Sequence, residues 1–191
     1  MKKIISFAIV LLALSACKKD KGEFVPTTVS NAEGYLEYNQ VDGDKNTNWY
    51  SIKAMDGLSS KSLIGDSEYQ ESIVFGYYNH ADTYGLFSPD NFPKPTEQGN
   101  WTTRLPISFR KTTITSNQMQ QYRDQYKDGF PVQLILDNWK KGTNEQKSIT
   151  PIQKDATYAF RSQDGKLTGL IQILTINNVN TNIQFEIWIA K

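Results

Sequence analysis

The chain has 191 residues, 38% of them hydrophobic and 21% charged, which suits one folded domain and excludes a largely disordered chain. The formal net charge is +1, so no basic excess favours nucleic acid as a partner. Aromatic residues are abundant, with 10 Tyr, 9 Phe and 4 Trp, and such rings suit half-buried strand faces. The composition therefore favours a globular, β-rich domain.

Residues 1–16 have the pattern of a secretory signal peptide. Lys2 and Lys3 give a positive start, and an apolar run follows over residues 4–14. This run is too short to cross roughly 30 Å of hydrocarbon as a helix, but it has the length of a signal core. Cys17, the single cysteine, comes directly afterwards and cannot form an internal disulfide.

Leu14-Ser15-Ala16-Cys17 resembles the lipobox of bacterial lipoproteins. The resemblance implies cleavage after Ala16 and lipidation of Cys17, and several acyl chains on one residue make a stable membrane anchor. An ordinary signal peptide followed by a chance cysteine is the alternative. Lys18 stands where an Asp can signal inner-membrane retention in envelope lipoproteins, so the resemblance implies an outer-membrane location, facing the periplasm or the cell surface.

Residues 17–34 are predicted to be the lipidated cysteine and a flexible tether, because this stretch is short, polar and contains Pro26. Residues 35–191 are then predicted to form a single mainly-β domain. Strands are expected over residues 48–53, 72–78 and 84–87, where β-branched and aromatic residues gather. Residues 79–83 are polar enough for a hairpin loop, and the three prolines between residues 88 and 95 exclude a central strand there.

One or two short helices are predicted to be inserted at about residues 115–142. Thr115 and Gln118 have the spacing of a capping box, and Gly129 is a natural helix terminator. Residues 132–139 fit a helix or a strand, and we favour a helix because their large apolar residues share one helical face.

The last forty residues predict an antiparallel meander with strands near residues 156–160, 169–176 and 183–189. The turn signal Asp164-Gly165 separates the first two strands, and strict alternation places Ile183, Phe185, Ile187 and Ile189 on one face of the third. The fold class that we predict is an antiparallel β-sandwich or a partly closed barrel.

The carboxyl end also resembles a large group of uncharacterised Bacteroidetes-type envelope lipoproteins. The resemblance is carried by Tyr158-Ala159-Phe160, Asp164-Gly165-Lys166, Gly169-Leu170-Ile171 and the alternating strand that ends at Lys191. It extends over about residues 47–191 and implies an envelope β-rich module. The group has no agreed activity, so it implies no catalytic residue.

Residues that could bind metal or act as catalysts are few, and no cofactor is expected. Asp42, Asp44 and Asn46 alternate as in an oxygen-rich calcium loop, but Thr47 and Lys53 stand where an EF-hand needs Gly and Glu, and a simple turn explains them too. His80, the only histidine, cannot form a multi-histidine zinc site. The acids Asp66, Glu68 and Glu71 are candidates for a glycosidase-like pair, or for a charged loop.

The aromatic residues are the remaining candidates for ligand contact. Trp49, Tyr78 and Trp101 are the candidates for ligand contact, because neighbouring residues on a strand point to opposite faces, and packing in the core or beneath the helical segment or loops is the favoured alternative. The leading functional prediction is a non-enzymatic binding module for a glycan or an envelope protein partner. The alternatives are an assembly lipoprotein that pairs through the free edge of the strand at residues 183–189, and a hydrolase.

Overall fold

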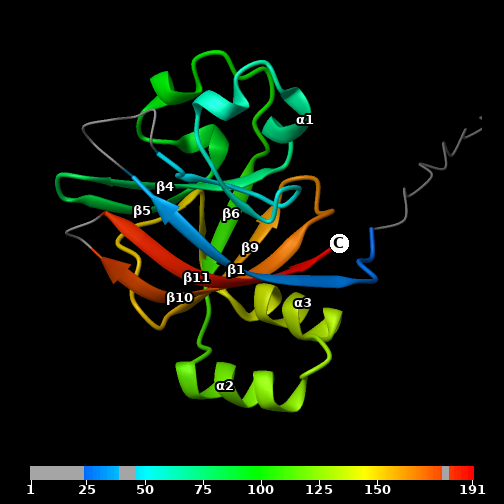
Figure 1. Cartoon of the computed structure of the whole chain (residues 1–191). Coiled ribbons are helices and arrows are strands. Elements are labelled where there is room, and N and C mark those ends of the chain that lie inside the picture. Colours follow the sequence, from blue (N-terminus) through cyan, green and yellow to red (C-terminus); the bar gives the residue numbers. More distant parts are fainter. Residues whose placement is uncertain (1–23, 39–45, 178–180) are drawn as a thin grey trace, which may run out of the picture.

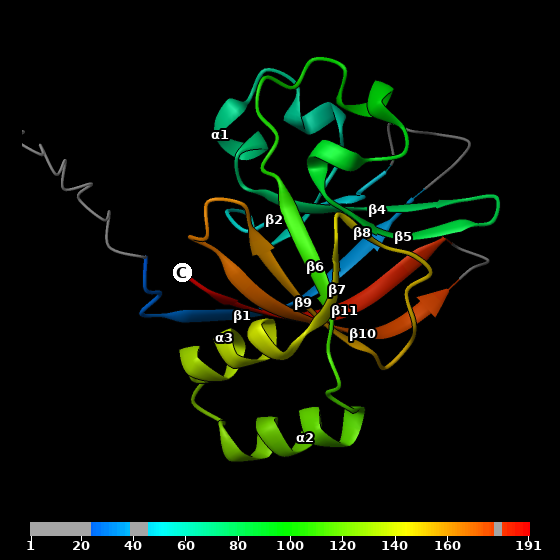
Figure 2. The same cartoon turned by 180° about the vertical axis from the view of Figure 1, so that it is seen from behind.

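The computed structural model describes residues 24–38, 46–177 and 181–191, and these form two antiparallel sheets packed face to face (Figures 1 and 2). The predicted mainly-β fold is confirmed. The sheets do not close on one another, so the architecture is a β-sandwich and not a barrel. Among the described residues no helix is long and apolar enough to cross a membrane.

The first sheet has six strands, and its centre is the predicted carboxyl-terminal meander. Alternation along the last strand confirms the expected inner face, because all four of its predicted apolar residues are buried. The strand order is β1 (Val29–Glu37), β11 (Asn182–Ala190), β10 (Thr168–Asn177), β9 (Thr157–Ser162), β6 (Ile107–Lys111) and β7 (Thr143–Gln146).

The strand β1 corrects the predicted boundary between tether and domain. It begins at Val29, not after residue 34, and pairs with β11 along its whole length. The backbone amides of Thr27 and Thr28 also donate to the Lys191 carbonyl, at 3.3 and 3.2 Å. Because β1 occupies the outer edge of β11, that edge is not free, and the predicted pairing of β11 with a partner strand is wrong.

The second sheet has five short strands and confirms the three strands predicted in this half of the chain. The expected loop over residues 79–83 is tighter than predicted, because His80 pairs with Thr83 and only Ala81 and Asp82 form the turn. The strand order is β3 (Asp56–Leu58), β2 (Trp49–Ser51), β4 (Ile73–His80), β5 (Thr83–Phe87) and β8 (Ser148–Ile149).

Aromatic rings from both sheets fill the space between them. The ring of Phe185 on β11 lies 5.2 Å from that of Tyr50 and 5.6 Å from that of Phe75, both on the second sheet. Gly34 on β1 makes room for it, since a Cβ there would lie 2.3 Å from the Phe185 ring. Such contacts bury large apolar areas and hold the two sheets together.

The two inserted helices cover the outer face of the first sheet (Figures 1 and 2). α2 (Ser116–Gln125) begins with the predicted capping box, and α3 (Val132–Lys141) confirms the helix favoured over residues 132–139. Between them, Phe130 stacks on Trp188 of β11 with ring centroids 4.6 Å apart. Arg123 of α2 donates to the carboxylate of Glu186, so both contacts fasten the insert to the sheet.

The outer face of the second sheet is covered by two irregular segments. The first, residues 59–72, contains a 3-10 helix (Lys61–Leu63) and α1 (Ser67–Gln70). The second, residues 88–106, contains 3-10 helices at Pro89–Asn91 and Pro95–Gln98, in keeping with the prolines that exclude a strand there. We call residues 88–106 the covering segment.

Candidate functional site

The predicted aromatic ligand-binding residues lie mainly in the core. Trp49 is completely buried and Trp101 is 7% exposed. The Trp49 ring lies 4.3 Å from Phe92 and 4.7 Å from Trp101, both on the covering segment, and its indole N–H donates to Ser60. Neither tryptophan is accessible to a ligand, so the favoured alternative of core packing holds for both and the ligand-contact candidacy fails. Tyr78 is half-buried and packs against other rings.

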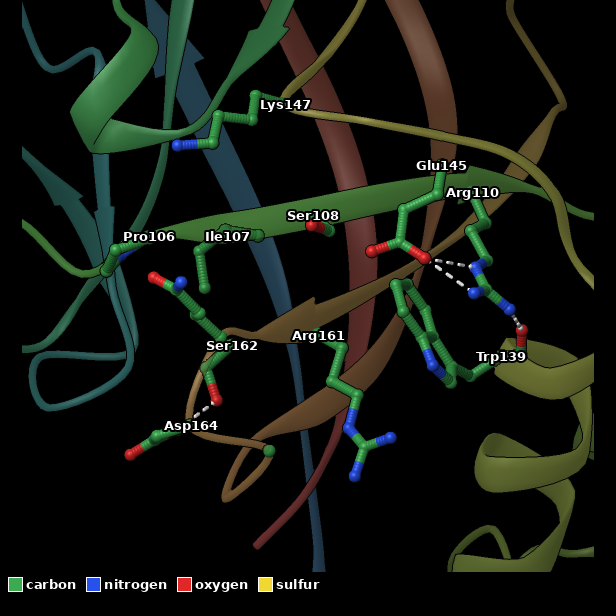
Figure 3. Close-up of a pocket in the computed structure, with 12 residues that line it drawn as sticks. Pro106, Ile107, Ser108, Arg110, Trp139, Glu145, Lys147, Arg161, Ser162 and Asp164 are labelled. Carbon is green, nitrogen blue, oxygen red and sulfur yellow. Dashed lines mark hydrogen bonds and ion pairs between the residues drawn. The ribbon is translucent and has the colours of Figure 1, made fainter.

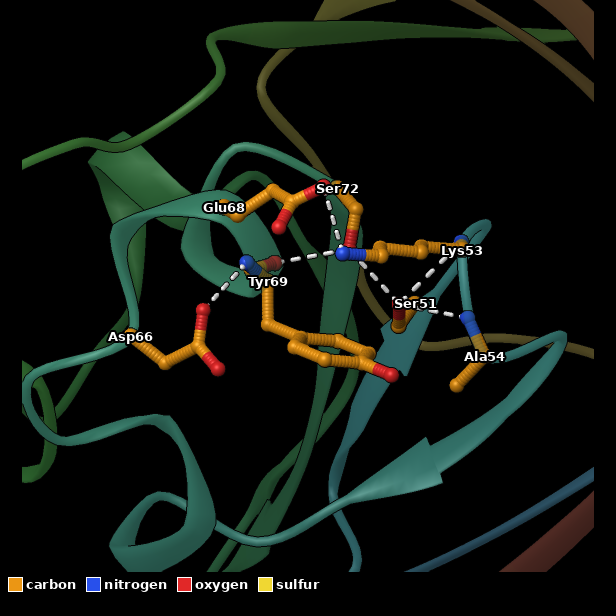
Figure 4. Close-up of polar contacts among 7 residues, drawn as sticks. All are labelled: Ser51, Lys53, Ala54, Asp66, Glu68, Tyr69 and Ser72. Atoms are coloured by element: carbon orange, nitrogen blue, oxygen red, sulfur yellow. Dashed lines mark hydrogen bonds and ion pairs between the residues drawn. The ribbon is translucent and has the colours of Figure 1, made fainter.

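Two of the three acidic residues proposed for hydrolysis, Asp66 and Glu68, have separate structural roles (Figure 4). Asp66 caps α1 by accepting a hydrogen bond from the Tyr69 amide at 3.1 Å. Glu68 is 77% exposed and pairs with Lys53 at 2.6 Å, and this hydrogen bond is the main cause of a raised Lys53 pKa. The Asp66 and Glu68 carboxylates therefore serve different contacts and do not form a pair across a cleft.

The metal-binding and lipidation candidates lie mostly outside the described residues. This applies to Asp42, Asp44 and Cys17, whereas Asn46 is described and buried. Within residues 24–38, 46–177 and 181–191, no group of three or more His, Cys, Asp or Glu side chains is placed to hold a metal ion. His80 is exposed at the end of β4.

A cavity of about 550 Å³ opens on the outer face of the first sheet, beside the end of α3 (Figure 3). We call it the β6–β9 cavity. Ser108 on β6 pairs with Arg161 on β9, and Arg110 pairs with Ala159, so all four side chains point to this face. The helix α3 packs over Ala159 and leaves the part around Ser108 and Arg161 open.

One wall of the β6–β9 cavity is built around Glu145, which reaches over β6 from the edge strand β7. Arg110 donates to Glu145 Oε2 from Nε at 3.0 Å and from Nη2 at 2.5 Å. Its third nitrogen donates to the Trp139 carbonyl at 3.0 Å, and the guanidinium lies 4.3 Å from the Trp139 ring centroid. Arg110 therefore joins Glu145 on β7 to the end of α3.

The electrostatics of this wall favour an ionised carboxylate. Hydrogen bonding from Arg110 is the largest cause of a lowered Glu145 pKa, and Ser108 and Arg161 lower it further, while partial burial opposes them. Glu145 thus offers a carboxylate acceptor that is ionised at neutral pH, between hydroxyl and guanidinium donors.

The opposite wall is the turn between β9 and β10. Ser162 Oγ donates to Asp164 at 2.6 Å and accepts from the Leu167 amide at 3.1 Å. The hydrogen bond from Ser162 is the main cause of a lowered Asp164 pKa. The Gln163 amide donates to the Pro106 carbonyl at 2.9 Å, which ties the turn to the start of β6. Hydrogen bonds within the turn and to Pro106 therefore hold this wall in place.

Replacing Glu145 with Gln is expected to make the acid side of the stability profile shallower. The folded-state pKa of Glu145 lies below its ordinary value of 4.5, so its contribution is present above that pH and is lost as the pH falls through the folded pKa. The Glu145 side chain is 46% exposed, so we expect less than about 1 kcal/mol. Urea unfolding across the acid range measures the effect, and identical pH profiles for the two proteins would contradict it.

Sequence reasoning did not find this cavity. Its walls come from β6, the end of α3, β7 and the β9–β10 turn, which are far apart in the sequence. Of the residues that line the cavity, the sequence pattern pointed only to the Asp164-Gly165 turn. Pairing of β6 with both β7 and β9 brings these segments together. The residue pattern of a single strand does not show which other strands it pairs with.

The described residues thus define an antiparallel β-sandwich with a helical insert on one face. No known family's sequence profile matches the chain, and no curated protein matches it. A solved structure with a similar fold is a DUF4466 family protein from Parabacteroides merdae ATCC 43184, 16% identical, with a TM-score of 0.50. The match covers 83% of this chain and 54% of that one, so this chain spans about half of that protein's length. The likeness shows the fold and supports the predicted resemblance to uncharacterised Bacteroidetes proteins.

Proposed function

We propose that the protein is a lipid-anchored envelope protein that binds a glycan, without catalysis, in the β6–β9 cavity. Cys17 carries the lipid, the outer membrane holds the anchor, and the sandwich presents the cavity to the ligand. The observation that carries the proposal is the convergence of hydrogen-bonding side chains on a cavity of about 550 Å³, a size typical of small-ligand sites.

The charges around the cavity favour an uncharged ligand with many hydroxyl groups. Its lining contains three basic residues, Arg110, Lys147 and Arg161, and two acids, Glu145 and Asp164. Arg110 pairs with Glu145, and Lys147 pairs with Asp90 just beyond the lining. A strongly charged ligand would have to compete with these contacts. Sugar hydroxyls can accept from the guanidinium groups and donate to the carboxylates at once.

Hydrogen bonding, rather than ring stacking, provides the binding energy in this proposal. Trp139 is only 7% exposed, and the Arg110 guanidinium lies over its ring. The accessible polar groups stand mostly on paired strands, which hold them in position before a ligand arrives.

Both acids in the cavity favour binding over hydrolysis. A glycosidase needs one carboxylic acid that stays protonated and donates its proton to the leaving oxygen. The pKa of Glu145 and the pKa of Asp164 are both lowered, mainly by hydrogen bonds from Arg110 and Ser162. At neutral pH both groups are therefore ionised acceptors.

Thermal unfolding of the full chain, purified in a non-glycosidic detergent, tests the binding proposal. The probes are the neutral hexasaccharides of glucose, xylose and mannose. A ligand at about 100 times its dissociation constant stabilises the native state by about 2.7 kcal/mol, a shift of several degrees in Tm. We expect Ser108→Trp, which fills the cavity, to abolish the shift.

Glu68→Gln serves as a surface control, because Glu68 lies in an exposed ion pair outside the cavity. It should leave the ligand-induced shift unchanged. A shift that survives Ser108→Trp would place binding elsewhere, and no shift with any glycan would reject glycan binding.

For the anchor, Cys17→Ser should eliminate incorporation of labelled fatty acid, and retained label would contradict lipidation at this residue.

A further inference from the structure

A second cavity of about 370 Å³ adjoins the β6–β9 cavity. We call it the Leu105 cavity, and it is lined by Glu71, Thr103, Arg104 and Leu105 together with Pro106 and Asp164. The last two residues also line the β6–β9 cavity, so the two hollows share a wall. The shared wall is held in place, because the Pro106 carbonyl accepts from the Gln163 amide.

The side chain of Gln70 connects two segments that contribute residues to the Leu105 cavity. Gln70 is 1% exposed at the end of α1, and its amide nitrogen donates to the Leu63 carbonyl at 2.7 Å. Its amide oxygen accepts from the Thr102 amide at 2.9 Å and from the Thr103 amide at 3.4 Å. One buried side chain thus joins residues 59–72 to the covering segment.

The Leu105 cavity combines an apolar surface with polar groups at its edge. Leu105 and Pro106 supply the apolar surface, while Arg104 and Glu71 supply a donor and an acceptor. Arg104 is oriented by a hydrogen bond from Nη2 to the Gln98 carbonyl at 3.1 Å. A sugar ring has the matching chemistry, with C–H groups on its faces and hydroxyls around its rim.

We propose that the two cavities form one groove across the β9–β10 turn, and that its ligand is an oligosaccharide with consecutive sugars in the two cavities. This inference rests on the proposed function and deepens it, since it excludes a free monosaccharide as the natural ligand. The β6–β9 cavity makes the principal hydrogen bonds. The Leu105 cavity is an extension subsite whose contacts add to the affinity of a longer chain.

Isothermal titration calorimetry of the full chain in a non-glycosidic detergent tests the groove. The probes are the hexasaccharide that gives the largest thermal shift and the monosaccharide of the same sugar. We expect the hexasaccharide to bind at least about tenfold more tightly. Arg104→Ala and Glu71→Ala should each weaken hexasaccharide binding several-fold and leave monosaccharide binding unchanged. Both residues are exposed, so these changes do not threaten the fold.

Lys154→Ala is the matched control, because Lys154 is an exposed cation that lines neither cavity. It should change neither affinity. Equal affinities for hexasaccharide and monosaccharide, or unchanged hexasaccharide binding in both subsite variants, would overturn the groove while leaving the β6–β9 cavity as a site. Absence of binding by every probe to the unchanged chain would instead overturn the proposed function, and the groove with it.

Discussion

Replacing Trp49 with Ala is expected to lower the free energy of unfolding by about 3–5 kcal/mol, the usual cost of removing a large buried aromatic side chain. Trp49 has no exposed surface and contacts the rings of Phe92 and Trp101. Its ring also lies directly against Gly76, where an added Cβ would be 2.6 Å from it. Removing the indole empties the space between the second sheet and the covering segment. Urea unfolding followed by circular dichroism measures the loss.

Trp49→Phe provides a milder variant if the alanine protein does not fold. It keeps a ring in the same place but loses the hydrogen bond to Ser60, so we expect a smaller destabilisation. The phenylalanine protein should bind glycan as well as the unchanged chain does, because Trp49 lies outside both cavities. Lost glycan binding with unchanged stability would instead indicate that Trp49 contacts the ligand.

Replacing Phe130 with Ala should release the helical insert from the first sheet and cost about 3 kcal/mol or more. Phe130 is 6% exposed and stacks on Trp188, with the two ring planes only 4° apart. The rings of Tyr122 and Tyr126 on α2 also pack against it, each 6.2 Å away. In the variant, amide hydrogen exchange should speed up more in α2 than in β10 and β11, because the sheet retains its own core.

Phe24→Ala is the control for Phe130→Ala, because the same ring is removed from a position that is 44% exposed. We expect a change within about 0.5 kcal/mol, as is usual for surface substitutions. If both alanine variants destabilise the protein equally, or if exchange rises uniformly over the sheet, Phe130 does not hold the insert as described.

Elements with strong local patterns were predicted correctly from the sequence. The strand β11 alternates apolar and polar residues from Asn182 to Ile187, and a shift of one residue would turn Ile183, Phe185, Ile187 and Ile189 away from the inner face. The start of α2 was equally clear, because the Thr115–Gln118 capping box depends on residues three positions apart. Alternation and capping depend on residues close together in the chain, so one sequence is enough to predict them.

Features that depend on partners distant in the chain were missed. β1 presents Ala32, Gly34 and Leu36 to the core, a row too small and too mixed to stand out as a strand pattern. It is a strand because β11 offers a complete edge of backbone donors and acceptors. The β6–β9 cavity was missed for the same reason, since its walls meet only through strand pairing.

The tryptophans show why a ring on the outer face of a strand is not always in solvent. Adjacent residues on a strand do point to opposite faces, and Trp49 lies on the outer face of the second sheet while Tyr50 points inward. That outer face is not in solvent, because the covering segment packs on it through Phe92 and Trp101. Proline-rich irregular segments have no periodicity, so their packing partners cannot be deduced from spacing.

The pairing of β1 with β11 determines how the domain would respond to mechanical load. A tether that emerges before Val29 pulls on β1, and a force along that strand stretches the hydrogen bonds to β11 together, because they run perpendicular to it. Shear of this kind must break many bonds at once, whereas peeling breaks them one at a time. If the chain is anchored through its amino terminus and binds a glycan as proposed above, it would thus resist tension through a ladder of nine residue pairs.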